Sequence, residues 1–110
     1  MLNIYVVCQL LVRALMPVAR TIREHNRDLA NQLERALVSI PLNVAEGSGQ
    51  RDGNRRQRYL TALGSAREVR AALETAISAG YVDSVDAQAL DSLDHIIATL
   101  VKVLGLHRTR

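Results

Sequence analysis

Four closely spaced arginines are the residues best suited to binding chemistry: Arg51, Arg55, Arg56 and Arg58. We expect them to surround the start of a helix, whose N-terminus is itself positively polarised, so together they would attract anions. A guanidinium group matches phosphate geometry, and phosphate contacts depend on the shape of a nucleic acid more than on its sequence. We therefore interpret them as a candidate site for binding RNA or DNA. A solvated helix start, balanced partly by acidic residues of the last helix, explains the same pattern.

No other group of residues indicates catalysis, a metal or a cofactor. The run GSGQRDG at 47–53 contains glycines, but it has neither the dinucleotide-binding spacing nor the Gly-Lys-Ser/Thr ending of a phosphate loop. His25, His95 and His107 lie far apart in the sequence, and Asp91 with His95 supplies only two ligands. The sequence contains neither a Glu-x-x-His pair nor a recognisable Ser, His and acid set. We expect a protein that is not an enzyme and needs no metal or cofactor.

Length and composition indicate one soluble domain over residues 1–110, with 48% hydrophobic and 23% charged residues. Cys8 is the single cysteine, which excludes an internal disulfide and favours a reducing compartment. Residues 1–12 are apolar, but they lack a signal-peptide pattern and are shorter than the roughly 20 residues of a membrane span. We therefore expect a cytoplasmic protein that does not cross a membrane.

The aromatic content and the charge distribution bear on how the protein could bind a nucleic acid. The three aromatic residues are tyrosines, so the core must be built from Leu, Ile, Val and Ala, and bases have no obvious stacking platform. Thirteen of the fourteen basic residues are Arg, which is weak evidence for nucleic-acid binding. Residues 51–70 carry a net charge of +4, whereas residues 71–106 carry −4. The positive potential is thus concentrated around the arginine cluster.

Apolar residues recur at helical spacing in four segments, which we expect to be helices at about 2–25, 28–47, 54–80 and 84–104, followed by a short basic tail at 105–110. Four helices, short connections and no strands predict an all-α, antiparallel up-down-up-down four-helix bundle. The first helix is apolar around much of its circumference, so we expect it to be buried on more than one side and bent at Pro17. A strand at Ile4–Val7 is the alternative start.

The remaining helices carry their own signals. We expect the second helix to continue past Pro41 with a kink, helped by Ser39 or Asn43, and a break at Ile40 is the alternative. Residues 47–54 form the clearest predicted loop. The third helix should end at a Gly80 cap, and its expected buried residues are Tyr59, Ala62, Ala66, Val69, Leu73 and Ala76. The fourth helix should begin at an N-cap at Ser84, and its expected buried residues are Leu90, Leu93, Ile97, Leu100 and Leu104.

The outer surface of the third helix carries mostly small residues, flanked by a stripe that mixes leucines with charges. Small residues allow another backbone to approach closely, so we infer that subunits associate through this helix. An indifferent surface rich in alanine, a good helix former, is the alternative. The predicted interface consists of Leu60, Leu63, Gly64, Arg67, Glu68, Ala71 and Ala72.

Two runs, SIPLNVAEG at Ser39–Gly47 and ALGSARE at Ala62–Glu68, resemble the 23S ribosomal RNA intervening-sequence family and the related accessory proteins of diversity-generating retroelements. The resemblance implies a cytoplasmic antiparallel bundle that assembles into a ring-like homopentamer and has no known enzymatic activity. The retroelement relatives bind a reverse transcriptase and nucleic acid through a basic surface. The polar positions that match the family are Arg35, Ser39, Asn43, Glu46, Arg51, Arg58, Ser65 and Glu68.

Arg35, Ser39 and Asn43 are one turn apart on the second helix, and Glu46 follows on a neighbouring stripe. We expect these four residues to form a buried polar network that fixes helix register or subunit contact. The sequence as a whole predicts a homo-oligomeric scaffold, a pentamer by the resemblance, that binds nucleic acid through a basic surface. The alternative is a structural or protein-binding ring without a nucleic-acid role.

Overall fold

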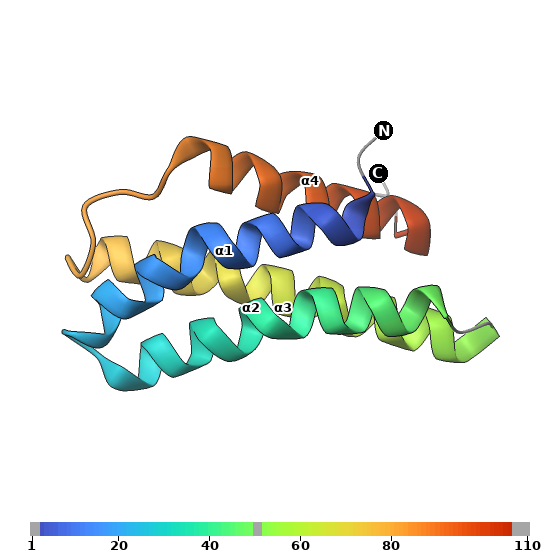
Figure 1. The fold of residues 1–110 in the computed structure, drawn as a ribbon, viewed down its shortest axis with the longest axis horizontal. Coiled ribbons are helices and arrows are strands. Elements are labelled where there is room, and N and C mark those ends of the chain that lie inside the picture. Colours follow the sequence, from blue (N-terminus) through green and yellow to red (C-terminus); the bar gives the residue numbers. More distant parts are fainter. Residues whose placement is uncertain (1–2, 50–51, 107–110) are drawn as a thin grey trace.

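A computed structural model describes residues 3–49 and 52–106, which form four helices: α1 (Ile4–Arg23), α2 (Arg27–Ser48), α3 (Asp52–Ser78) and α4 (Ala87–Leu104). Figure 1 shows each helix running opposite to the one before it, so that α1 begins and α4 ends at the same end of the bundle. The described ranges contain no strand. The prediction of an all-α four-helix bundle is confirmed.

The helices pack in the order α1, α2, α3, α4 around a common core, with the closest packing between α2 and α3 and the sparsest between α1 and α4. Alanines bring α2 and α3 together, because Ala30, Ala36, Ala62 and Ala66 are all buried. The predicted core stripe of α3 is confirmed, from Tyr59 to Ala76. Every fully buried side chain in the described part of the chain is apolar or is Cys8.

The prediction that α1 is buried on more than one side is wrong. One stripe enters the core: Val7, Cys8, Leu11, Leu15, Ala19 and Ile22. Tyr5, Val6 and Leu10 remain 39%, 42% and 49% exposed, because α1 contacts α2 and α4 and no element of the described chain covers its outer surface. The helix is continuous through Pro17 and begins after the N-cap Asn3, which excludes the alternative of a strand at Ile4–Val7.

Helix α2 is also continuous through its proline, Pro41, so the alternative of a break at Ile40 is wrong. Asn43 Nδ2 donates hydrogen bonds to the carbonyl of Ser39 at 2.9 Å and to Ser39 Oγ at 3.0 Å. The carbonyl that loses its helical donor at Pro41 is that of Leu37, so these contacts do not replace the missing bond. The predicted loop at 47–54 is much shorter, because α2 extends to Ser48 and α3 begins at Asp52.

The loop is shorter than predicted because Gly47 belongs to the helix, although glycine is common in turns. Gly47 lies inside α2 and is buried, and a Cβ added there would lie 2.4 Å from Cε1 of Tyr59. The glycine thus makes room for an aromatic ring on the neighbouring helix, a role that is compatible with helical backbone.

Glycines follow the C-terminal ends of α3 and α4, and the N-cap of α4 differs from the predicted residue. Gly80 and Gly105 have φ values of +80° and +70°, and both lie just beyond the ends of their helices. The N-cap of α4 is Asp86 rather than Ser84, since an Asp86 carboxylate oxygen accepts the amide of Ala89 at 3.0 Å. This later start shortens α4, whose core stripe contains Ala89 and Ile96 in addition to Leu93, Leu100 and Leu104, while Leu90 and Ile97 are only partly buried.

Helix α1 is long and apolar enough, by length and composition alone, to cross a membrane. Core helices of soluble proteins pass the same test, and the buried stripe of α1 forms part of the core of this bundle.

Candidate nucleic-acid interface

The first turns of α3 place the described arginines of the predicted cluster on different sides of the helix. At 100° per residue, Arg55 lies almost directly one turn before the core residue Tyr59, whereas Arg56 and Arg58 lie on opposite flanks. Arg51 lies outside the described residues. Arg55 and Arg56 therefore lie on the side of α3 that borders α4, and Arg58 lies on the side that borders α2.

Arg58 reaches towards α2. Its Nε lies 3.0 Å from an oxygen of Glu46, and one of its terminal nitrogens lies 3.5 Å from Oδ1 of Asn43. The side chains of Arg58 and Glu46 are 49% and 53% exposed, so solvent screens the pair and its contribution to stability is small. The pairing nevertheless offsets the positive charge of Arg58, so less of that charge is available to an anion from outside the chain.

Arg56 reaches in the other direction, towards the end of α4. It donates a hydrogen bond of 2.9 Å to the carbonyl of Leu104, one of the last carbonyl groups of that helix. A cation at a helix C-terminus is stabilising, because it complements the negative end of the helix dipole. This contact holds one terminal nitrogen of Arg56, while the side chain as a whole remains exposed.

Arg55 is exposed and stacks on Tyr59, with its guanidinium carbon 5.7 Å from the centroid of the ring. Arg55, Arg56 and Tyr59 line one side of a groove of about 390 Å³, which Val103 and Leu104 of α4 close on the other side. An anion that entered this groove would meet two guanidinium groups with unused donors. We call this groove, lined by Arg55, Arg56, Tyr59, Val103 and Leu104, the Arg55 groove.

The predicted polar network exists in part, but it is not buried. Ser65 Oγ of α3 donates a hydrogen bond of 2.7 Å to Ser39 Oγ, and Asn43 continues the chain of contacts towards Arg58 and Glu46. The network runs along the outer edge where α2 meets α3, so it fixes the register of these two helices at a partly solvated surface. Arg35 is exposed and forms no hydrogen bond with the described members of the network.

Some residues of the predicted subunit interface on α3 are buried within the single chain, and the others lie at its surface. Leu63 and Ala72 are 2% and 5% exposed and belong to the core of the single chain, so the prediction that they contact another subunit is wrong. The error follows from the wide core face of α3, which packs against both α2 and α4. Leu60 is half-buried, and the exposed members of the predicted interface are Gly64, Arg67, Glu68 and Ala71.

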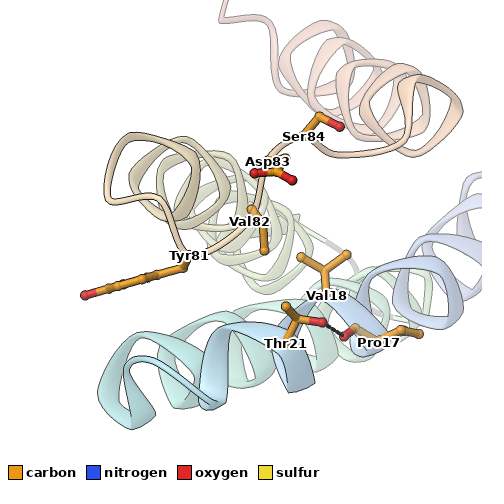
Figure 2. A pocket seen from close by; sticks show the side chains of 7 residues that line it. All are labelled: Pro17, Val18, Thr21, Tyr81, Val82, Asp83 and Ser84. Carbon is orange, nitrogen blue, oxygen red and sulfur yellow. Dashed lines mark hydrogen bonds between the residues drawn. The ribbon is translucent and has the colours of Figure 1, made fainter.

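A second groove, of about 440 Å³, lies at the opposite end of the bundle, between α1 and the segment that joins α3 to α4. Figure 2 shows Val18 of α1 and Val82 facing one another across it, with Asp83 and Ser84 along the connecting segment. Next to it, the rings of His25 and Tyr81 stack with centroids 5.3 Å apart, and Asn26 donates to the Tyr81 hydroxyl at 3.3 Å. The hydrogen bond between Asn26 and Tyr81 joins residues 55 positions apart, so the local sequence pattern does not predict it.

The buried thiol of Cys8 and the possible metal ligands bear on the chemistry open to the part of the chain that the structure describes. Burial raises the pKa of the Cys8 thiol to about 12, which makes it a poor nucleophile. Among residues 3–49 and 52–106, no three His, Cys, Asp or Glu side chains lie close enough together to hold a metal ion. The described surface can bind a partner through its charged side chains and its exposed apolar side chains.

The fold and the arginine-rich bundle end define a small helical bundle protein with a basic surface at one end. A family model described as 23S rRNA-intervening sequence protein matches residues 2–103, nearly the whole chain. The chain belongs to this family. No curated protein and no solved structure shows detectable similarity to it.

Proposed function

We propose that this protein is a cytoplasmic, non-enzymatic scaffold that assembles from several copies of the chain and binds nucleic acid through the Arg55 groove. The observation that carries the proposal is the Arg55 groove itself, where two exposed guanidinium groups, those of Arg55 and Arg56, lie together at one end of the bundle. Assembly would place several such ends close together, and multivalency would raise the affinity for a polyanion. By the family resemblance, we propose a pentamer, with a reverse transcriptase as a further candidate partner.

Salt dependence tests the nucleic-acid part of the proposal. We expect the wild-type protein to bind a duplex DNA or a structured RNA, measured by fluorescence anisotropy, with an affinity that falls steeply between low and moderate salt. For duplex DNA, the slope of log affinity against log salt should decrease by about 0.9 for each phosphate contact that Arg55→Ala removes. Arg27→Ala removes the same charge at the start of α2, at the opposite end of the bundle, and should leave the slope unchanged.

A specific observation favours a second candidate, an assembled ring that binds proteins and has no nucleic-acid role. Arg58 is paired with Glu46, and Arg56 donates a hydrogen bond to the end of α4. Part of the positive charge is therefore used in contacts within the single chain. If the wild-type protein fails to bind RNA or DNA even at low salt, this second function replaces the first. Equal salt slopes for Arg55→Ala and the wild type would show that binding occurs elsewhere.

A further inference from the structure

The outer surface of α1 carries a continuous uncharged stripe, most of which is apolar. Val6 and Leu10 are one helical turn apart and are 42% and 49% exposed. Ala14, Pro17 and Thr21 continue the stripe along the helix, and all three are exposed. Only 28% of the residues in the most apolar 18-residue window of α1 are buried in the bundle. A stripe that is both uncharged and this long is typical of a binding surface.

One edge of the stripe is basic. Arg13 and Arg20 are exposed and lie two helical turns apart, on the side of Leu10 that faces away from α4. Neither arginine forms an ion pair with another residue in the described part of the chain. Arg23, the next arginine along α1, is paired with Glu34 of α2 and does not contribute to this edge.

The other edge is acidic. Asp86 lines a groove between α1 and α4 together with residues of the segment Leu10–Ala14. Asp83 lines the groove of Figure 2 together with residues of the segment Pro17–Thr21. Both aspartates are exposed and, within the described ranges, neither forms an ion pair. The Asp86 carboxylate caps α4 through one oxygen, which leaves the other available.

The two edges are in register along the helix. Arg13 lies within the segment beside Asp86, and Arg20 lies within the segment beside Asp83. A rotation about an axis parallel to α1 keeps every residue at the same height along that axis. A second copy placed by such a rotation would therefore face Arg13 with its Asp86 and Arg20 with its Asp83, while the apolar stripes lie at the contact.

We propose that this α1 surface, the stripe with its basic and acidic edges, is where a second copy of the chain packs side by side in parallel orientation. The inference rests on the self-association in the proposed function and assigns the contact to α1 rather than α3. A second copy satisfies both edges at once. An anionic lipid surface would attract Arg13 and Arg20 but repel Asp83 and Asp86, so charge complementarity favours the second copy.

A pair of leucine variants tests the apolar stripe. We expect Leu10→Glu to shift the wild-type assembly to the monomer in sedimentation velocity, because it places a charge at the centre of the contact. Leu42→Glu is the matched control: Leu42 is 61% exposed on α2, outside the α1 surface, and its variant should sediment like the wild type. Circular dichroism of both variants should retain the helical content of the wild type.

A charge exchange tests the register and does not depend on how well Leu10→Glu folds. Arg20→Glu and Asp83→Arg should each weaken self-association by about tenfold or more, because each creates a like-charge contact with the second copy. The double variant, which exchanges the two charges, should restore the assembly. Failure of the double variant to restore it would overturn the proposal.

The other outcomes separate this inference from the proposed function. If Ala71→Glu on α3 dissociates the protein while Leu10→Glu does not, the contact lies on α3 and only the inference on α1 is wrong. If the wild type is a monomer at every concentration, the scaffold function and the inference fail together. A wild-type monomer that co-sediments with anionic vesicles through Leu10 would show that α1 binds lipid, and would likewise overturn the proposal.

Discussion

Replacing Gly47 by alanine should destabilise the bundle, although the same replacement is stabilising in most helices. An alanine in the middle of a helix is favoured over glycine by about 1 kcal/mol. At position 47, however, the added Cβ would lie 2.4 and 2.6 Å from two ring atoms of Tyr59, a side chain that is only 9% exposed. Moving a packed ring of this size costs about 1–3 kcal/mol, which exceeds the gain in helix propensity that remains near the end of α2.

Gly64 provides the matched control, because it lies within α3 and a Cβ added there would meet no atom within 4 Å beyond its chain neighbours and the adjacent backbone of its own helix. We expect Gly64→Ala to raise the free energy of unfolding by about 0.5–1 kcal/mol and Gly47→Ala to lower it. Urea unfolding at one fixed protein concentration measures both. In a Tyr59→Ala background, Gly47→Ala should lose its cost, as a double-mutant cycle would show. Equal effects of the two glycine replacements in the wild-type background would refute the packing argument.

Two further predictions concern the start of α4 and the buried thiol. Asp86→Ala should lower the free energy of unfolding by about 1 kcal/mol, because it removes the N-cap of α4. Asp86→Asn and Ser84→Ala should change the free energy of unfolding much less, because Asn also caps helices and Ser84 is not the cap. Equal losses for Asp86→Ala and Ser84→Ala in urea unfolding would contradict the assigned cap. The pKa of Cys8 rises from 9.0 to about 12 on folding, so its contribution to stability is complete below pH 9 and is lost as the pH rises towards 12. Native protein at pH 8 should therefore react with a thiol reagent far more slowly than unfolded protein, and fast labelling of the native state would show that Cys8 is accessible.

The number of helices and most of the core could be predicted from the sequence, because burial imposes helical spacing on the apolar residues. The stripe from Cys8 to Ile22 and the stripe from Tyr59 to Ala76 were both recognisable in this way. Local chemistry also identified the Gly80 cap, since positive φ is costly for other residues.

Features that depend on a partner element could not be predicted. Gly47 has the sequence signature of a loop, and only the position of the Tyr59 ring explains why it belongs to a helix. The exposure of Val6 and Leu10 could not be anticipated either, because an apolar residue has the same pattern whether its own chain or another molecule covers it. The cluster of arginines was recognisable, but the directions of Arg56 and Arg58 depend on the neighbouring helices that they reach.

The central claim is that several copies of the chain assemble, since both the combined positive potential and the α1 contact require it. Sedimentation equilibrium of the wild-type protein at micromolar concentration tests it most directly. We predict a particle whose mass is a multiple of the 12.1 kDa chain, and by the family resemblance a fivefold multiple. A single 12.1 kDa species that persists as the protein is concentrated would contradict the claim.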